Sequence, residues 1–483
     1  MQPWEYERNR FLEAEPGSRR APLGWERAER TARERDEQLR SLWASTVPES
    51  GAPVCLMIAA VAAMENRGYR VRDWEAAALQ ALHAAESAGQ GDMDALIRAH
   101  IRVQRAINRA EVDRSSSYWS KDRYSSYGEF LRRSRLADAE SAPSSRPALA
   151  PDEDAYRSKV RGCWIGQAVG GALGTPLEGY TSSALKQRYG DITGYVTDPN
   201  PMNDDLTYQI AFLQAVGRHG AAVTSDKIAA EWAALIPYGW SAEAVALENI
   251  LNGTLPPDSA MQRNPFSDWI GAQMRGAAPG LIAPGDSRLA ARLAWLDAAV
   301  SHTANGILGE VFNAVMTAAA FVETDVRRVV SDAVDAIPAE TEYGEVVRYA
   351  LYCCTSWGDP ATALARCDEG FARYHWVHSY PNACIEIIAL WYGNGDFDAT
   401  ARIVAGAGYD VDCNAAQALG ILGAMHTDAA IPTRWVEPLG SQIATYCRGI
   451  PEISFDALVD LTVTARKSLI SATTGDSQAP ENA

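Results

Sequence analysis

The feature that most constrains the fold is a helical pattern that runs almost unbroken from residue 155 to about residue 448. Ala- and Leu-rich stretches are separated there by turns rich in Gly, Pro and Asp, and few runs of β-branched residues show strand-like alternation. The pattern predicts one compact all-α domain. Residues 453–471 are expected to add one or two closing helices. The last residues, 472–483, carry no apolar face and are expected to form a disordered tail.

The N-terminal part of the chain differs in composition and is expected to form an extra helical region. Arg and Glu are dense in residues 1–46, which is typical of a solvated helical arm. Two or three helices are predicted further on, from the apolar run at Val54 and over 74–87 and 93–107. The predicted division is a helical extension (1–112), a Ser/Pro-rich linker or surface-draped segment (113–152), a main domain (153–471) and the tail (472–483).

Charge and hydropathy restrict the partners of this chain. Lys and Arg number 44 against 61 Asp and Glu, a formal net charge of −17, which disfavours nucleic-acid binding through a basic surface. The longest apolar stretches fall short of the roughly 20 residues that cross a bilayer, and the first residues do not resemble a secretory leader. We therefore expect a cytoplasmic protein with no membrane partner. Its eight cysteines include no C-x-x-C pair and are expected to be reduced.

Paired carboxylates stand at the start of two predicted helices. The first group is Asn203, Asp204 and Asp205, and the second is Asp410, Val411, Asp412, Cys413 and Asn414. A single Asp at a helix start is an ordinary cap, but two neighbouring acids cannot both cap one helix. If the two ends face each other, the four carboxylates repel unless divalent cations neutralise them. Oxygen ligands of this kind suit Mg²⁺, with Mn²⁺ and Ca²⁺ as alternatives, rather than zinc.

A glycine recurs every four residues in the stretch that precedes these groups, at positions 162, 166, 170 and 174. This spacing places the glycines on one face of a helix, where a second backbone can approach closely. Tight helix packing is the expected role of the glycines whatever the function is. Pro176 is expected to end the helix and to leave Glu178 on the following loop.

In this order, the motifs resemble the ADP-ribosylglycohydrolase family, which includes dinitrogenase reductase-activating glycohydrolases and crystallin J1-like proteins. The resemblance covers roughly residues 157–445. The stretches 271–280 and 301–306 look like the family's segments near the bound ligand. It implies an all-α orthogonal multi-helix bundle in which two divalent cations, usually Mg²⁺, orient the ribose of an ADP-ribosyl group. The glycosidic bond from that ribose to an acceptor is then hydrolysed.

The resemblance also assigns roles to residues of this chain. The metal motifs fall on Asn203, Asp204, Asp205, Asp410, Asp412 and Cys413. Glu178, Asp205 and Asp412 take the catalytic positions, with Glu178 near the scissile bond. His302, Asn305, Gly306 and Asn414 take substrate-binding positions, His302 near the phosphates or the distal ribose.

Two departures from the family pattern bear on the substrate. Asn203 replaces a Thr or Ser, and its amide oxygen still suits a hard cation. Val411 and Cys413 replace the threonines of a D-T-D-T motif, and a thiol is a poor ligand for Mg²⁺, so Asn414 is expected to supply the missing oxygen. The implied partner is an ADP-ribosylated protein. The alternatives are hydrolysis of a small ribosylated, nucleoside-like metabolite, or a family member that only binds ligand or is structural. The sequence does not predict the oligomeric state.

Overall fold

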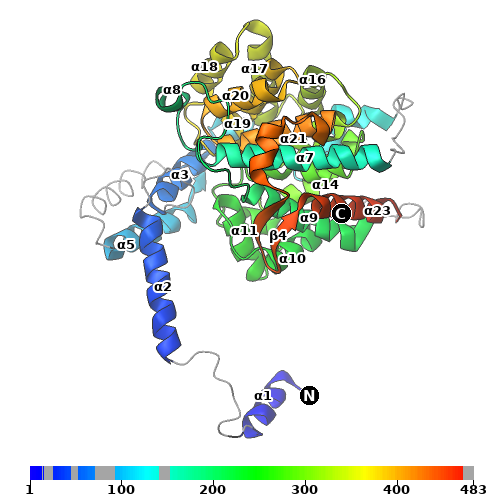
Figure 1. The fold of residues 1–483 in the computed structure, drawn as a ribbon. Helices are drawn as coiled ribbons and strands as arrows, with labels where there is room; N and C mark the ends of the chain where they lie inside the picture. Colours follow the sequence, from blue (N-terminus) through cyan, green and yellow to red (C-terminus); the bar gives the residue numbers. More distant parts are fainter. Residues whose placement is uncertain (14, 16–24, 45–52, 71–92, 141–152, 472–483) are drawn as a thin grey trace.

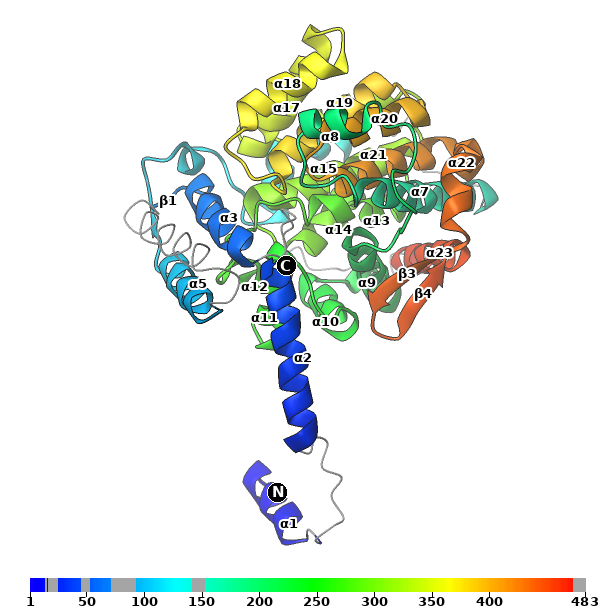
Figure 2. The same ribbon diagram turned by 60° about the vertical axis from the view of Figure 1, so that its left-hand side comes forward.

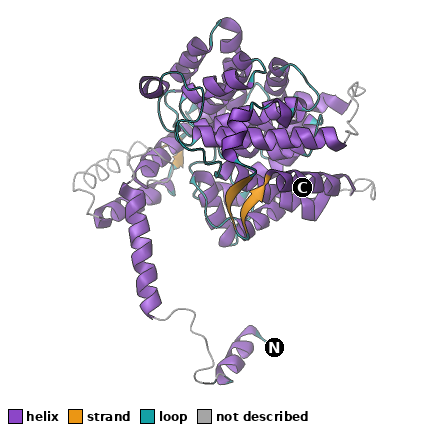
Figure 3. Ribbon diagram, in the orientation of Figure 1, coloured by secondary structure: helices purple, strands orange, loops and turns teal. Residues whose placement is uncertain are grey.

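The computed structural model describes residues 1–13, 15, 25–44, 53–70, 93–140 and 153–471. The all-α prediction is confirmed, since helices make up nearly all of the regular structure described (Figure 3). The helix predicted over 74–87, the last part of the predicted linker and the tail 472–483 lie outside the described residues. No helix in the described ranges is long and apolar enough to cross a membrane.

The N-terminal region consists of helices and one very small sheet (Figure 2). Its elements are α1 (Pro3–Leu12), α2 (Trp25–Ala44), α3 (Pro53–Asn66), β1 (Tyr69–Arg70), α5 (Met93–Ile107), β2 (Glu111–Val112), η1 (Ser117–Ser120), α6 (Tyr127–Arg133) and η2 (Arg135–Glu140). Helices α1 and α2 project away from the body of the molecule, and α1 has no buried residue (Figure 1). Its solvated character agrees with its Arg- and Glu-rich sequence.

The main domain is a bundle around the long helix pair α7 and α21 (Figure 1). Its first half consists of α7 (Glu153–Gly174), α8 (Ser182–Tyr189), α9 (Asp204–His219), η3 (Gly220–Ala222), α10 (Ser225–Leu235), α11 (Ser241–Leu251), α12 (Asp258–Met261), η4 (Gln273–Arg275), α13 (Ala277–Leu281), α14 (Ser287–Ala298) and α15 (Ala304–Ala320). Its second half consists of α16 (Val326–Ala336), α17 (Glu342–Ser356), α18 (Pro360–Phe371), α19 (Ser379–Gly393), α20 (Phe397–Ala407), α21 (Val411–His426), η5 (Asp428–Ala430), α22 (Thr433–Val436), η6 (Glu437–Leu439), β3 (Gln442–Cys447), β4 (Ile450–Ser454) and α23 (Phe455–Ser471).

The glycine repeat of α7 packs against α21, the helix that begins with the second acidic group. A Cβ atom at Gly166 would lie closer than 3 Å to the carbonyl of Leu419, and one at Gly174 would lie equally close to the backbone of Asp412. Only glycine permits this approach, so the two helices touch backbone to backbone along the repeat. The packing fixes α21, and with it Asp412, against the C-terminal end of α7.

The helical prediction is wrong between residues 442 and 454, where the chain forms an antiparallel hairpin of β3 and β4. Cys447 pairs with Ile450, so Arg448 and Gly449 make the turn, and Gly449 has a φ of +78°. A glycine at positive φ is the usual requirement of a two-residue hairpin turn. The short strands carry β-branched residues, and Ile443 is buried. One closing helix, α23, follows the hairpin.

The segment from residue 113 to residue 140 lies on the main domain through specific polar contacts. Tyr118 donates a hydrogen bond of 3.0 Å to Asp268, and Tyr127 donates one of 2.9 Å to the carbonyl of Arg288. Ser134 donates one of 2.6 Å to the carbonyl of Ala336. The hydroxyl groups of Tyr118 and Ser134 are buried where they form these bonds. The segment is therefore held against the main domain at several points along its length.

We expect Gly166→Ala to destabilise the protein by about 1–3 kcal/mol, because the added methyl group pushes α7 away from the backbone of α21. Gly217→Ala in α9 is the matched control, since nothing lies within 4 Å of its Cβ position. That substitution should stabilise the helix by about 0.5–1 kcal/mol. Urea unfolding of both variants measures the difference. Equal effects at the two positions would contradict the close packing of α7 on α21.

Candidate functional site

The first acidic group lies at the start of α9, where Asn203 is the N-cap. The Asn203 side chain accepts a hydrogen bond from the amide of Leu206 at 3.4 Å and donates one of 3.2 Å to Asp205. A Cβ atom at Gly171 would overlap the Asn203 amide, so the glycine makes room for this cap. Asn203 therefore orients the Asp205 carboxylate, which is fully buried.

The second group begins at a backbone turn with left-handed φ angles, +78° at Gly408 and +66° at Tyr409. Tyr409 exchanges backbone hydrogen bonds with the loop after α7: its amide donates to Tyr180 at 3.0 Å and its carbonyl accepts from Gly179 at 2.9 Å. This pairing fixes the loop of Glu178 beside α21. A side-chain hydrogen bond joins Glu178 to Asp412.

The two helix starts face each other, which is the arrangement in which their carboxylates need a counter-charge. The thiol of Cys413 lies 3.3 Å from the carboxylate of Asp205, which joins α21 to α9. One ligand atom each from Asp410, Asp412 and Cys413 lies within 4.8 Å of the others, and all three residues are buried. Four aspartates thus converge from two helix N-termini.

Crowding of these acids alters their protonation. Burial, followed by the charges of Asp412 and Glu243, raises the pKa of Asp204 to about 7. Burial and the charge of Asp412 also raise the pKa values of Asp205 and Asp410 well above the ordinary range. Without a counter-charge, the cluster is costly to ionise.

The donor set of this cluster suits a hard divalent cation. One carboxylate oxygen of Asp410, one of Asp412 and the amide oxygen of Asn414 are buried and have no hydrogen-bond partner. Buried oxygens of this kind normally have a partner, and a cation supplies one. The other half of the Asn414 amide donates to Asn382 at 2.8 Å, which aims its free oxygen. Burial, followed by the charge of Asp205, raises the pKa of Cys413, so this residue remains a thiol and is a poor partner for Mg²⁺.

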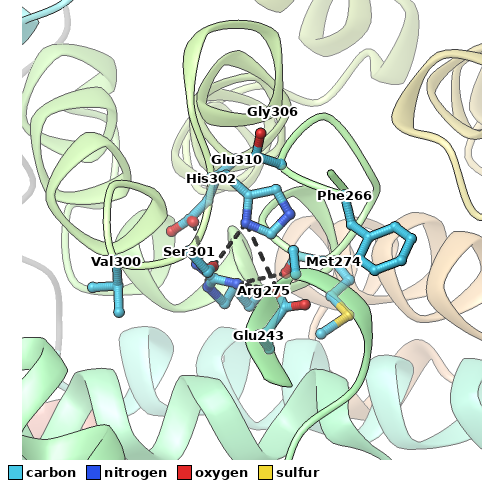
Figure 4. Close-up of polar contacts among 12 residues, drawn as sticks. Glu243, Phe266, Met274, Arg275, Val300, Ser301, His302, Gly306 and Glu310 are labelled. Atoms are coloured by element: carbon cyan, nitrogen blue, oxygen red, sulfur yellow. Dashed lines mark hydrogen bonds and ion pairs between the residues drawn. The ribbon is translucent and has the colours of Figure 1, made fainter. Parts of the chain in front are cut away.

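Of the remaining predicted binding residues, Asn305 and Gly306 lie in the first turn of α15 and His302 lies two residues before that helix. Figure 4 shows His302 beside Ser301 and Glu243. His302 is buried, with its Nδ1 2.7 Å from the Ser301 hydroxyl and 3.7 Å from Glu243. Burial, followed by the charge of Arg275, lowers the pKa of His302 well below its ordinary value, so the ring is neutral. Asn305 accepts a hydrogen bond from the Tyr343 amide at 3.2 Å.

Gly306 has a mainly structural environment. Its amide donates to Asp268 at 3.3 Å, and a Cβ atom there would overlap the carbonyl of Ser267. Asn305 and Gly306 therefore hold the start of α15 in place.

Comparison with known proteins shows the family of the main domain. A family model described as ADP-ribosylglycohydrolase matches residues 152–466. This chain belongs to the ADP-ribosylglycohydrolase family. It is similar to an uncharacterized protein of Archaeoglobus fulgidus, with 26% identity over 312 residues that cover 58% of this chain and 91% of the relative.

Among solved structures, one described as an ADP-ribosylglycohydrolase-related protein complex matches with 17% identity and a TM-score of 0.45. The match covers 65% of this chain and 99% of the other. Family membership supports hydrolysis of a glycosidic bond as the general chemistry of the domain. Residues 1–151 lie outside the family match.

The sequence analysis missed a buried cluster of charged side chains around Arg275. Arg275 is fully buried and forms ion pairs with Glu243 at 2.8 Å, Asp297 at 2.6 Å and Glu310 at 3.5 Å (Figure 4). Burial alone would lower the pKa of Arg275, but the charges of Asp297, Glu310 and Glu243 raise it. The three acids lie on separate helices and are not regularly spaced in the sequence. Only the motif around Arg275 therefore stood out in the sequence.

A second buried network supports the backbone of α21. Asn313 donates to Glu386 at 3.1 Å and to Gln417 at 3.0 Å, and Gln417 donates to the carbonyl of Cys413 at 2.9 Å. Gln273 donates to the other oxygen of Glu386 at 3.1 Å. The network links α19 and α15 to the helix that carries the second acidic group.

We expect Glu386 to make stability fall as pH rises. Burial raises its pKa from the ordinary 4.5 to about 8, so the folded protein holds a proton that the unfolded chain releases. The resulting stabilisation is complete below pH 4.5 and is lost as pH rises through about 8. Relative to wild type, Glu386→Gln should therefore gain up to about 1.4 kcal/mol per pH unit across this window.

Urea unfolding of wild type and Glu386→Gln from pH 5 to pH 8 measures this gain. Glu369→Gln, on an exposed face of α18, is the control and should show no such trend. A pH-independent difference between wild type and Glu386→Gln would show that Glu386 is ionised in the folded protein.

Proposed function

We propose that this protein is a divalent-metal-dependent hydrolase of the glycosidic bond between ADP-ribose and an acceptor. The observation that carries the proposal is the pair of facing helix starts. At the start of α21, buried oxygens of Asp410, Asp412 and Asn414 have no partner. The family assignment supports the reaction class. The cations, usually Mg²⁺ in this family, are the cofactors that such oxygens would hold.

The side chains of the cluster divide between those that would hold the cations and those that orient a ligand. Asp204, Asp205, Asp410 and Asp412 would hold the cations, together with the amide oxygen of Asn414. When bound, divalent cations supply a binding site for the ribose hydroxyls and lower the pKa of a bound water. Asn203 and Cys413 each contact the Asp205 carboxylate and keep it pointed into the cluster.

Glu178 is the residue proposed to act at the scissile bond. Hydrolysis of a glycosidic bond passes through an oxocarbenium-like state and needs an acid or base beside the anomeric carbon. The loop of Glu178 is fixed by backbone bonds to Tyr409, and its side chain reaches Asp412. From a position beside Asp412, this carboxyl group would transfer a proton to or from the reacting groups. Asp205 or Asp412 would orient the attacking water.

A small ribosylated metabolite is the second candidate substrate. The observation that favours it is the N-terminal region, which lies outside the family match and packs on residues beside His302. A minimal domain that acts on proteins needs an open approach, whereas an added segment restricts access.

The proposal is tested by incubating the full chain with ADP-ribosylated proteins and with small ribosylated compounds, in Mg²⁺, Mn²⁺ or EDTA. The expected result is release of the free ribosyl group from at least one substrate, with the rate abolished by EDTA and restored by the cation. Release that continues unchanged in EDTA, or no release from any substrate with either cation, would contradict it.

A further inference from the structure

A cavity of about 810 Å³ lies between the N-terminal region and the main domain. One wall is formed by residues that precede the family match, among them Arg67, Trp119 and Arg123. The opposite wall includes Arg263 and His302. This volume is within the range of small-molecule sites in proteins.

The charged side chains that line the cavity are positive, although the chain has a formal net charge of −17. Three arginines line it, Arg67, Arg123 and Arg263, and no Asp or Glu is among its described lining residues. Asp268 lies 3.8 Å from Arg67, and Glu248 lies 3.8 Å from Arg263, so these two arginines have partial counter-charges.

Arg123 differs from the other two arginines. It forms no close ion pair with a carboxylate in the described part of the chain, although it interacts with the charge of Asp268. Its Nε is buried without a hydrogen-bond partner. Its guanidinium lies over the ring of Trp119, 4.0 Å from the centroid. An arginine held on an aromatic face presents its remaining donors in a fixed plane, which suits an anionic oxygen group.

The aromatic part of the wall is also fixed. The indole of Trp119 donates a hydrogen bond of 2.6 Å to the carbonyl of Gly68, and the ring of Tyr118 packs edge-on against it at 5.2 Å. Gly68 has a φ of +72°, and a Cβ atom there would overlap the indole. Planar, rigid side chains beside arginines are the combination that binds a base and its phosphates.

We propose that this cavity binds a nucleoside phosphate, with the phosphates on Arg123 and the base against the aromatic wall. None of the four aspartates lines the cavity, so binding there does not need the metal cluster. Two ligands carry this chemical group. One is the nucleoside diphosphate part of the substrate proposed above, and the other is a separate nucleotide that occupies the cavity independently.

Calorimetric titration of the full chain with ADP in EDTA tests the proposal. ADP should bind, and adenosine and inorganic phosphate should bind more weakly because each makes only part of the contacts. Arg123→Gln should weaken ADP binding about tenfold or more, the effect of losing one charge-assisted hydrogen bond. Arg114→Gln, an exposed arginine of the same segment that does not line the cavity, is the matched control and should bind as wild type does.

Competition identifies the source. Displacement of ADP by ADP-ribose in the presence of Mg²⁺ assigns the cavity to the substrate, and simultaneous binding of both assigns it to a separate nucleotide. The proposal is overturned if ADP does not bind, or if Arg123→Gln and Arg114→Gln bind it equally. Because no turnover is measured, failure here is distinct from failure of the hydrolase proposal.

Discussion

Asp412→Asn is expected to lower the rate of metal-dependent hydrolysis by at least about a hundredfold. Loss of a residue that only supports a metal ligand costs about 10- to 100-fold, and Asp412 is proposed to hold the cation itself and to contact Glu178. The substitution keeps the size of the side chain and removes one of the mutually repelling buried carboxylates. We therefore expect the variant to melt at or above the wild-type temperature in EDTA.

The measurement is the initial rate on the best substrate, at several Mg²⁺ concentrations, together with the melting temperature in EDTA. Asp456→Asn is the control, because this aspartate is 82% exposed at the start of α23 and pairs only with Arg161 among the residues described. It should hydrolyse substrate at the wild-type rate. A near-normal rate for Asp412→Asn would exclude Asp412 from the reaction centre.

Arg275→Met should reduce the free energy of unfolding by about 3–5 kcal/mol. The methionine fills much of the space but leaves Glu243, Asp297 and Glu310 buried without the cation that neutralises them. Burial already raises the pKa values of Glu243 and Glu310, so these acids take up protons readily when the arginine is lost. The destabilisation should therefore be smaller at pH 5 than at pH 8.

Arg366→Met provides the comparison, since Arg366 and Glu369 form an exposed pair at 3.0 Å on α18. Its loss should cost less than about 1 kcal/mol at either pH. Urea unfolding at both pH values separates the two cases. If Arg275→Met cost no more than Arg366→Met, the buried cluster would contribute nothing specific to stability.

The helix starts of the acidic groups could be predicted because their signals are local. Paired acids directly before an apolar helical pattern indicate that Asp204 and Asp412 stand at helix starts. The glycine repeat indicates that a second backbone packs close to α7. The facing of α9 and α21 was not predicted, since it depends on how distant helices pack. The sequence indicated only that four carboxylates brought together would need a shared counter-charge.

Other features depend on contacts between distant residues and left no local signal. The partners of Arg275 lie on α11, α14 and α15, and the ring of Trp119 depends on a glycine 51 positions earlier. The hairpin of β3 and β4 was missed because its strands are short and sit at the end of a long helical pattern. The binding roles implied for Asn305 and Gly306 stay predictions, since their contacts hold the start of α15.

Thermal unfolding with EDTA, Mg²⁺, Mn²⁺ or Ca²⁺, each with and without ADP-ribose, tests the central claim most directly, on wild type and Asp412→Asn. A ligand that binds only the folded state raises the melting temperature, by an amount that grows with the logarithm of its concentration divided by its Kd. The account predicts that a divalent cation raises the wild-type melting temperature, that ADP-ribose enlarges the shift, and that Asp412→Asn loses it. A wild-type melting temperature that no cation changes would contradict the metal centre formed by α9 and α21.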